Sequence, residues 1–485
     1  MCGIAGLITS ALPSHVKRLR IKHMMRLLAH RGPDDEGVFE DSHGCLGHCR
    51  LSIIDLSSGG HQPMVDGNHV LVFNGEIYNH NELRKELETR GVEFRSHSDT
   101  EVLLRGFQVW GYETPMKLRG MFSFALWDSK ERRLFCARDP FGKKPFYYYC
   151  DNRQFIFASE VEAVVAGLNA RPNIDYFGLS HYLLKGYFGP EKSIYGSVRT
   201  LGAGQCLEVN MRDVRIKTWP YLKIRFALGR ALPIEYETLT KNCNDLLGRA
   251  VDRRFESDVP VGVTLSGGVD SSLVSLISAE RQPQHQTFTV SFKNAAFDET
   301  QYATQIASRV RSDHVVVDVA MNSLQNILPR LIEAYGEPYG DFSAIPSYCL
   351  FQAIKPYIKV GLMGDGGDEV FGGYKDAKLY LLREKLSKFV GIGDLFPESL
   401  LFRFMNSTWG RSRALGYAIK GLQSDGSKVF QALRRSGWTS FWRRKMMRPE
   451  VWRNTGESET EREEGKKFMD LGQTDLERYL NFNLE

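Results

Sequence analysis

The second residue of the chain has a side chain that could act as a nucleophile and carry its own base. If Met1 were removed, Cys2 would hold a thiol and a free α-amine on one residue. The reference pKa values of an α-amine and a thiol are about 8 and about 8.5, so proton transfer between them near neutral pH costs little. Gly3 and an apolar stretch follow, a setting that also fits a plain buried cysteine. Cys2 alone therefore leaves both interpretations open.

A loop rich in serine and glycine, SGGVDSS from Ser266 to Ser272, is a second candidate for chemistry. It directly follows the apolar segment VGVTL and precedes apolar residues at helical spacing, Leu273, Leu276 and Ile277. A loop between a strand and a helix exposes backbone N–H groups at the helix N-terminus, where the helix dipole favours a polyphosphate. The loop lacks the GK[ST] of a Walker loop. A simple turn that caps a helix is the alternative interpretation.

A second glycine-rich loop, GDGGDEVFGGY from Gly364 to Tyr374, is acidic and follows the apolar segment KVGLM. Ligands of parallel α/β sheets bind at the carboxyl ends of the strands, so we expect both loops to face one crevice. Asp270 and Asp368 could then jointly hold Mg²⁺ against phosphates, because this cation prefers oxygen ligands.

The elements that must position these residues differ between the two halves of the chain. Up to about Ala170, short apolar strands alternate with glycine-rich turns, and apolar residues at every third or fourth position predict helices at Lys17 to Leu28 and Asn81 to Arg90. This pattern predicts an α+β sandwich. The irregular, charged stretch from Asn210 to Tyr236 is predicted to be a linker.

The second half begins with a predicted helix from about Glu237 to Phe255 and then alternates strands with helices. The strands are VGVTL, TFTVSF, HVVVDV and KVGLM, and helical patterns follow the first three. Such alternation predicts a doubly wound parallel sheet that is covered by helices on both faces. The length of 485 residues also favours more than one domain.

Composition excludes several classes of protein. The formal charge of +5 arises from 63 basic and 58 acidic side chains, an excess too small to indicate a nucleic-acid partner. The eight cysteines lack the spacing of a disulfide scaffold, so we expect reduced thiols. Basic residues follow the apolar start, which is the wrong order for a secretory signal. No apolar run reaches the roughly 20 residues of a membrane span, and we expect a cytoplasmic protein.

Three further features have ordinary interpretations. His43, Cys45, His48 and Cys49 lie close together, but no distant second pair completes a zinc site, and strand alternation would separate them onto two faces. The stretch RRSGWTSFWRRKMMR from Arg434 fits a helix with apolar packing and a basic outer face better than a nucleic-acid or membrane surface. The charged run ESETEREEGKK from Glu457 fits a solvated surface.

The motifs MCGIAG, HRGPDDEG, GHCRLSIIDL, FNGEIYNH, SDTEVLL and RDPFGKKPFYY occur in this order and cover nearly all of residues 2–165. The series resembles the class II glutamine amidotransferases, whose N-terminal-nucleophile (Ntn) domain hydrolyses glutamine. The resemblance implies that Cys2 is the nucleophile and that the Asn74 side chain and the Gly75 N–H form the oxyanion hole. Such donors are each worth about 3 to 4 kcal/mol in the transition state.

The same resemblance implies two charged anchors for glutamine. Arg50 would bind the α-carboxylate, and Asp99 with Glu76 would bind the α-ammonium. The implied glutamine-binding set is Arg50, Leu51, Ser52, Ile53, Ile54, Asn74, Gly75, Glu76 and Asp99. A surface ion pair for Arg50 and a helix cap for Asp99 are the alternatives.

SGGVDSS resembles the SGGxDSS loop of ATP pyrophosphatases, which cleave ATP between the α and β phosphates and adenylate a substrate. The resemblance implies that Asp270 and Asp368 bind Mg²⁺ and that Asp365 lies near the activated carboxylate. The implied ATP-binding set is Leu265, Ser266, Gly267, Gly268, Asp270, Ser271, Ser272, Val290, Met363 and Gly364. As side chains alone, Val290 and Met363 also fit the core.

The two domains together, in this order, resemble the glutamine-hydrolysing asparagine synthetases, and EPYGDFSAIPSY from Glu337 is similar to their substrate-side segment. The resemblance implies an Ntn domain at 2–209, a linker at 210–236 and an ATP-pyrophosphatase domain at 237–485. It also implies glutamine, aspartate and ATP as substrates and Mg²⁺ as cofactor. Ammonia would pass through an internal tunnel to β-aspartyl-AMP and give asparagine, AMP and pyrophosphate.

The family pattern continues with K-x-D-R, E-x-R-x-P-F-L-D and a lysine, whereas this sequence stops at YLNFNLE. We therefore expect a shortened synthetase domain, or one that a second polypeptide completes. Uncovered apolar surface would favour association, for instance as a homodimer. Two alternative functions stay open. One is an amidotransferase that acts on another carboxylate, such as a surface-sugar acid, and the other is a glutaminase or regulatory subunit without synthetase activity.

Overall fold

The computed structural model describes residues 1–224, 234–283, 285–292, 298–319, 324–341 and 343–374, together with a few isolated later positions. The charged run from Glu457 lies outside the described residues, as does the basic aromatic stretch from Arg434 except for its last two positions. The chain forms two compact units. The first comprises Met1–Asp175, Pro190–Lys223 and Ile234–Gly364, and the second comprises Tyr176–Gly189, Ile224–Pro233 and Asp365–Glu485.

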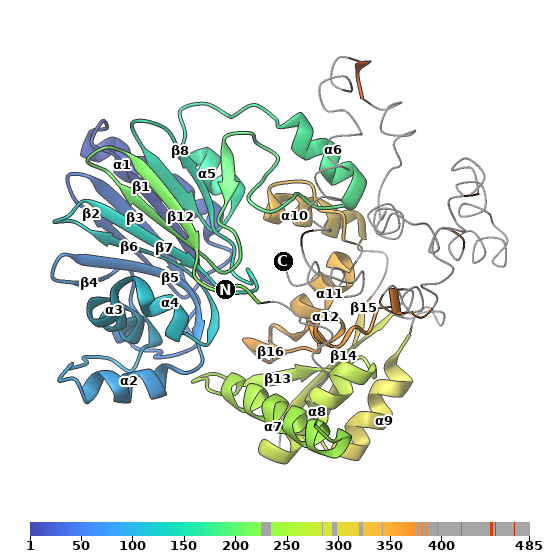
Figure 1. The fold of residues 1–485 in the computed structure, drawn as a ribbon. Coiled ribbons are helices and arrows are strands. Elements are labelled where there is room, and N and C mark those ends of the chain that lie inside the picture. Colours follow the sequence, from blue (N-terminus) through green and yellow to red (C-terminus); the bar gives the residue numbers. More distant parts are fainter. Residues whose placement is uncertain are drawn as a thin grey trace. The chain divides into compact units, whose positions relative to one another are not determined.

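The N-terminal part of the first unit is a sandwich of two six-stranded antiparallel sheets (Figure 1). One sheet has the order β10-β8-β9-β1-β3-β2, and the other has the order β12-β11-β7-β6-β5-β4. The strands are β1 Gly3–Ile8, β2 Asp35–Glu40, β3 Gly44–Arg50, β4 Met64–Asp66, β5 His69–Ile77, β6 Gly120–Asp128, β7 Arg133–Arg138, β8 Tyr147–Cys150, β9 Phe155–Ala158, β10 Val198–Thr200, β11 Gln205–Asn210 and β12 Arg215–Pro220.

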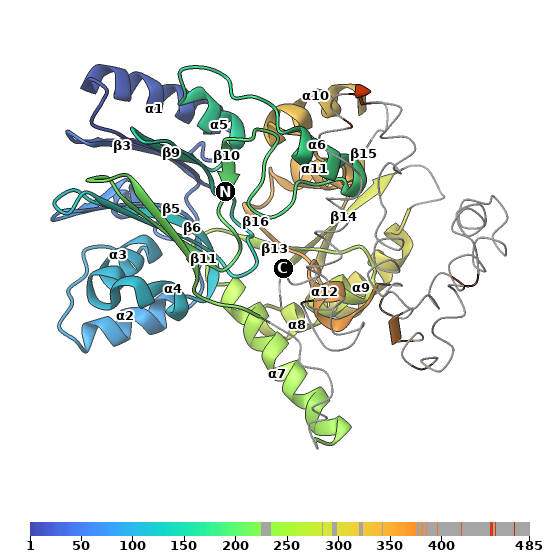
Figure 2. The same ribbon diagram turned by 45° about the horizontal axis from the view of Figure 1, so that its top comes forward.

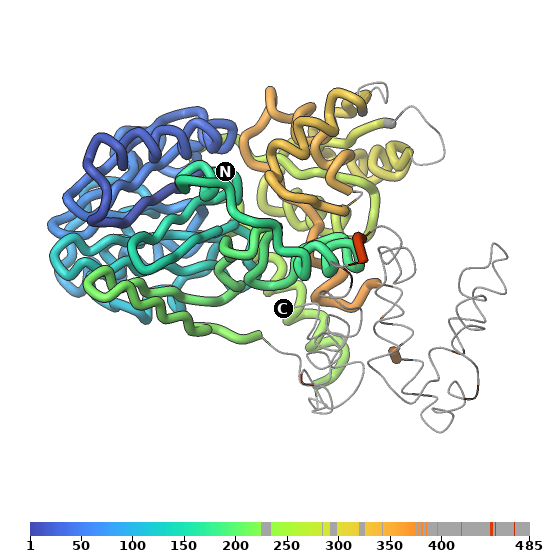
Figure 3. The backbone as a smooth tube through the Cα atoms, turned by 90° about the horizontal axis from the view of Figure 1, so that it is seen from above, coloured from blue at the N-terminus to red at the C-terminus, as the bar shows by residue number. Residues whose placement is uncertain are grey.

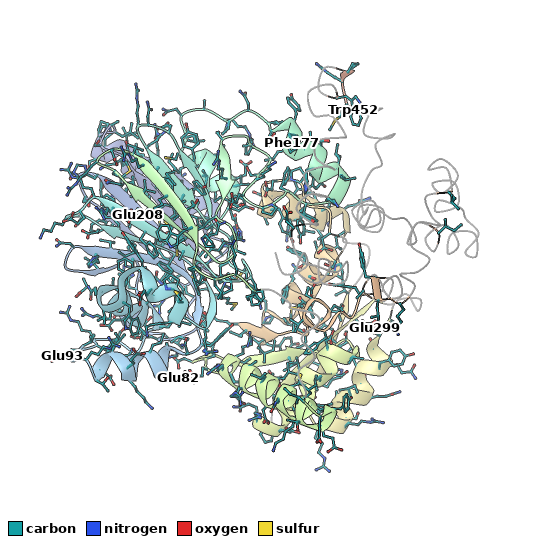
Figure 4. All side chains as sticks on the ribbon, in the orientation of Figure 1. Glu82, Glu93, Phe177, Glu208, Glu299 and Trp452 are labelled. Carbon is teal, nitrogen blue, oxygen red and sulfur yellow. The ribbon has the colours of Figure 1, made fainter. Side chains whose placement is uncertain are left out.

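Strand alternation explains the layers of the sandwich. In β5, Val70 and Val72 join the core between the sheets, whereas Leu71 and Phe73 join the core beneath the helices on the outer face. Helices α1 Ser14–Leu28 and α5 Val161–Ala166 cover one sheet, and α2 His80–Glu88, α3 Asp99–Trp110 and α4 Thr114–Lys117 cover the other (Figure 2). The exposed carboxylates Glu82 and Glu93 lie on the outside of this second helical layer (Figure 4).

The stretch from 210 to 236, which we expected to be a linker, contains β12. This strand pairs with β11 from Gln205 opposite Pro220 to Asn210 opposite Arg215, so the antiparallel sheet extends into that stretch. The domain boundaries themselves stay a prediction.

The later part of the first unit contains a four-stranded parallel sheet of order β15-β14-β13-β16. Its strands are β13 Val261–Thr264, β14 Gln286–Phe292, β15 Asp313–Val319 and β16 Val360–Leu362. The helices around it are α7 Tyr236–Arg254, α8 Val269–Arg281, α9 Thr300–Val310, α10 Leu324–Tyr335 and α11 Ala344–Ile354. Figure 3 traces the backbone from the blue, teal and green part that forms the sandwich to the yellow-green and orange part that forms this sheet and its helices. The predicted fold, an α+β sandwich followed by a parallel α/β sheet, is confirmed.

In the second unit, α6 Tyr176–Lys185 and the short α12 Gly367–Phe371 are described. Among the helices of the described ranges, none combines the length and apolarity needed to cross a bilayer. The apolar start of the chain forms β1, and every residue of this strand is buried.

Candidate active sites

Cys2 lies directly before β1 and faces the end of β3. Its thiol donates to the carbonyl O of Leu51 at 3.7 Å, and the Leu51 N–H donates to Sγ at 3.4 Å. Gly3 is required behind it, because a Cβ at this position would lie 2.8 Å from the Cβ of Leu28 in α1. The absence of a side chain at Gly3 therefore allows α1 to pack closely on β1 beside Cys2.

Burial governs the ionisation of the N-terminal groups. In the chain with Met1, burial lowers the pKa of the terminal ammonium to about 5. Burial also raises the pKa of the Cys2 thiol, while the Leu51 N–H and the terminal ammonium lower it. Both effects favour uncharged forms, so the amine here is in the state that can accept a proton.

Arg31 fixes the backbone of the predicted nucleophile. Its Nε donates to the carbonyl O of Cys2 at 3.0 Å, and its Nη1 donates to Glu160 at 2.9 Å. Arg31 belongs to the motif HRGPDDEG but was not among the residues expected to function. Its place within a recognised motif was the one signal that could have identified it.

Asn74 and Gly75, the predicted oxyanion hole, lie in β5. His48 of β3 contacts the carbonyl O of Phe73 through Nε2 at 3.0 Å, which ties this part of β5 to the strand that leads to Leu51. Asn74 is fully buried, and within the described residues neither Nδ2 nor Oδ1 has a hydrogen-bond partner. A buried amide without partners is costly and uncommon, which indicates a site for a ligand.

Gly75 is confined by its neighbours. A Cβ at this position would lie 2.2 Å from the carbonyl O of Met121 in the adjacent strand β6. Only glycine therefore permits this approach of the two strands beside Asn74.

Arg50 ends β3, and the loop that follows holds its guanidinium. Nη1 donates to the carbonyl O of Ser57 at 2.9 Å, and Nη2 donates to the carbonyls of Ile54 and Asp55. The loop is itself bound by Asp258, whose carboxylate accepts the Asp55 N–H at 2.7 Å and whose N–H donates to the Ile53 carbonyl at 3.0 Å. Carbonyl groups orient this buried guanidinium without neutralising it, which suits a group that binds an anion.

Glu76 and Asp99, the predicted ammonium anchors, are adjacent carboxyl groups. Asp99 accepts the Ile77 N–H at 3.0 Å, and burial raises its pKa. Burial and the nearby Asp99 charge raise the pKa of Glu76 well above its ordinary value. The alternative that Asp99 caps α3 is wrong, because Ser98 is the cap and accepts the Thr100 N–H at 3.1 Å. Two buried acids of like charge would be stabilised by a cation between them.

The predicted polyphosphate loop connects β13 to α8, and this strand, loop and helix context is confirmed. Serine hydroxyls fold the loop. The Gly268 N–H donates to Ser266 Oγ at 3.2 Å, and the Ser266 and Ser271 hydroxyls are 3.0 Å apart. Gly267 has a φ of +84°, and a Cβ there would lie 2.5 Å from the Cβ of Tyr302. The glycine thus permits both the turn and the approach of α9.

Further predicted ATP-binding residues lie within or directly after neighbouring strands. Met363 and Gly364 follow β16, the parallel neighbour of β13, and Val290 lies within β14. A Cβ at Gly364 would lie 2.7 Å from the Ser271 N atom, so the two loops touch at the start of α8.

The predicted metal pair is divided between the units. Asp270 lies in the first turn of α8, whereas Asp365 and Asp368 belong to the second unit, with Asp368 in the first turn of α12. Asp270 and Asp368 are both carboxylates, the oxygen donors that Mg²⁺ prefers. Their pairing stays a prediction.

His48 and Cys49 of β3 point in different directions. His48 contacts Phe73 of the opposite sheet, whereas the Cys49 thiol donates to the Met25 carbonyl of α1 at 3.5 Å. All eight cysteines, each within the described residues, are free thiols, as expected.

Residues 1–221 match the family of glutamine amidotransferase domains, and residues 242–485 match the asparagine synthase family. Glutamine-hydrolysing asparagine synthetase 1 of Bacillus subtilis is 36% identical over 393 residues, which cover 80% of this chain and 60% of that protein. A putative glutamine-hydrolysing asparagine synthetase of Methanocaldococcus jannaschii is 35% identical over 77% of this chain and 76% of its own length.

Among solved structures, a glutamine phosphoribosylpyrophosphate amidotransferase from B. subtilis is similar over 70% of this chain and 94% of that chain, at 14% identity and a TM-score of 0.36. That score is too low to support an argument. This chain spans 60% of the length of the B. subtilis synthetase.

Proposed function

The chain belongs to the family of glutamine-hydrolysing asparagine synthetases, and on this premise we propose that it moves the amide nitrogen of glutamine onto aspartate in an ATP-dependent reaction. The observation that carries the proposal is the buried Asn74 amide, which has no partner among the described residues. It lies in the strand that His48 ties to the Cys2 side of the sandwich.

The glutaminase step follows from the groups around Cys2. After removal of Met1, the thiol gives its proton to the α-amine, and sulfur attacks the amide carbon of glutamine. The oxyanion accepts hydrogen bonds from Asn74 Nδ2 and the Gly75 N–H. The C–N bond then breaks, ammonia leaves with the proton from the α-amine, and water hydrolyses the thioester to glutamate.

Charge selects glutamine among amides. The Arg50 guanidinium, oriented by the carbonyls of its loop, receives the α-carboxylate, and Asp99 with Glu76 receives the α-ammonium. The backbone of residues 51–54 completes the pocket beside Cys2.

The second reaction adenylates aspartate. The N–H groups of the Ser266–Ser272 loop bind the pyrophosphate end of ATP at the N-terminus of α8. Asp270 and Asp368 would hold Mg²⁺, which neutralises phosphate charge. The aspartate carboxylate attacks the α-phosphorus, pyrophosphate leaves, and ammonia displaces AMP from β-aspartyl-AMP to give asparagine. In this scheme Asp365 lies near the activated carboxylate.

Two assays test the halves separately. The purified protein is expected to release glutamate from glutamine, and Cys2→Ala is expected to abolish this release. Persistent glutamate release by the variant would contradict the nucleophile assignment. Aspartate, ATP, Mg²⁺ and an ammonium salt bypass the glutaminase, and pyrophosphate with asparagine is the expected result. If pyrophosphate appears with a different carboxylic acid but not with aspartate, that acid takes the place of aspartate as the acceptor in the proposal.

A further inference from the structure

Two adjacent lysines in the motif RDPFGKKPFYY have opposite environments. Lys143 is exposed, whereas Lys144 is 4% exposed. Lysine is almost never fully buried unless its charge has a role or a partner, because desolvation of an ammonium is costly. Neither lysine was among the residues that we expected to function.

The fold places Lys144 one strand away from the predicted oxyanion hole. Asp139 accepts the Lys144 N–H at 2.9 Å and the Phe122 N–H of β6 at 3.3 Å through the same oxygen. Phe122 is the register partner of Gly75 in β5. The Ser123 hydroxyl, opposite Asn74, donates to the carbonyl O of Pro145 at 3.0 Å. The segment that carries Lys144 is therefore fastened to the strand beside Asn74 and Gly75.

The ammonium of Lys144 belongs to a cluster of ionisable groups from several elements. The groups that interact electrostatically with it or with the N-terminal thiol and amine are Glu76, Arg31, Cys2, Asp139 and Cys49. Burial lowers the pKa of Lys144 to about 8, and Glu76 opposes this effect. In the chain with Met1, Lys144 in turn lowers the pKa of both the Met1 amine and the Cys2 thiol, whereas Glu76 raises both.

These opposing effects identify a conflict within the pocket. A site for the α-ammonium of glutamine needs carboxylates, and Glu76 and Asp99 supply them. Negative charge beside the N-terminus, however, favours a protonated amine and a protonated thiol, which is the inactive form of the pair. The buried ammonium of Lys144, which interacts with both Glu76 and Cys2, offsets that charge.

We propose that Lys144 is a positioning residue for charge: its buried ammonium prevents the thiol and amine of the N-terminal residue from both being protonated in the presence of the ammonium-binding carboxylates Glu76 and Asp99. This inference rests on the proposed glutaminase. It assigns Lys144 an effect on the pH dependence of the nucleophile, in addition to any effect on packing.

The test compares three variants of the full-length protein after mass spectrometry has confirmed removal of Met1. Lys144→Met removes the charge, Lys144→Arg keeps it, and Lys143→Met is the matched control in the neighbouring exposed lysine. The first measurement is the rate at which iodoacetamide alkylates Cys2 as a function of pH, followed on the Cys2 peptide. This reaction needs no turnover.

We expect Lys144→Met to move the alkylation midpoint upward by about one pH unit, which slows alkylation about tenfold below the midpoint. Lys144→Arg and Lys143→Met should retain the wild-type midpoint. The acid limb of kcat/KM for glutamine should move in the same direction and by the same amount in Lys144→Met. If circular dichroism shows that Lys144→Met is unfolded, Lys144→Gln takes its place.

An unchanged midpoint in a folded Lys144→Met or Lys144→Gln protein would overturn the inference, as would an equal shift in Lys143→Met. A wild-type protein that alkylates with the expected pH dependence but releases no glutamate from glutamine would contradict the proposed function instead. The two failures are therefore distinguishable.

Discussion

The backbone N–H of Ile77 donates a 3.0 Å hydrogen bond to the carboxylate of Asp99. This bond joins the end of β5, just past Glu76, to the first turn of α3. The carboxylate thus has a structural role through one oxygen and, in the proposed function, a charge role toward the substrate. The two roles can be separated by substitution.

Asp99→Asn retains an oxygen that accepts from Ile77 but removes the negative charge. We expect the KM for glutamine to rise about tenfold or more, because a charge-assisted hydrogen bond to the α-ammonium is lost. The melting temperature should change little. Steady-state kinetics and thermal unfolding measure both, and an unchanged KM would remove Asp99 from the glutamine pocket.

Asn74→Ala should separate activity from stability. Loss of an oxyanion donor is expected to lower the kcat of glutamine hydrolysis about 100- to 1000-fold. The melting temperature should hold or rise, because the buried amide of Asn74 has no partner among the described residues. A large fall in melting temperature would show instead that the amide has a structural partner.

Glu76→Gln tests how much the buried acid pair of Glu76 and Asp99 lowers the free energy of unfolding. A carboxyl group whose pKa is raised by folding contributes stability at low pH, and this contribution is lost as pH rises through the folded-state pKa. Relative to the Gln variant, the wild-type protein should therefore lose unfolding free energy as pH rises above about 4.5. Denaturant titrations at several pH values give the comparison. The KM for glutamine should rise in the same variant, and parallel pH dependences would contradict this assignment.

Gly267→Ala should affect the nucleotide half alone. Its φ of +84° and the 2.5 Å approach to the Cβ of Tyr302 make alanine both strained and overcrowded. We expect the loss of ATP-dependent pyrophosphate release, with glutamine hydrolysis retained. Gly91→Ala is the control, because Gly91 has a φ of +82° but a Cβ there meets nothing within 4 Å. That variant should lose only about 1 to 2 kcal/mol of unfolding free energy, because of backbone strain. It should retain both activities.

The order of elements and much of the predicted site could be read from local pattern. Alternating apolar residues predicted the sandwich strands, and the change to alternating strands and helices predicted the parallel sheet. Helical spacing placed α1 and α2 to within three residues, because an amphipathic helix is a local property. Motif order was sufficient to nominate Cys2, Asn74, Arg50 and Asp99.

Local pattern was insufficient where the outcome depends on distant segments. It treated residues 210–236 as a linker, but β12 lies there and pairs with β11. Pairing with a neighbouring strand stabilises an edge strand, so the strand can form without a marked apolar pattern of its own. It offered Asp99 as a helix cap, but the neighbouring Ser98 has that role and Asp99 turns to β5.

By itself, the sequence determined which residue types were available. These are a thiol at position 2, an amide before Gly75, and two acids and an arginine that can bind the charged groups of an amino acid. Only the tertiary structure decided how each is used. It left the Asn74 amide without a partner among the described residues, turned Arg50 toward carbonyls, and buried Lys144 while exposing Lys143. The reason is physical. Burial and electrostatic environment are set by packing between segments far apart in the chain, and spacing along the chain does not encode that packing locally.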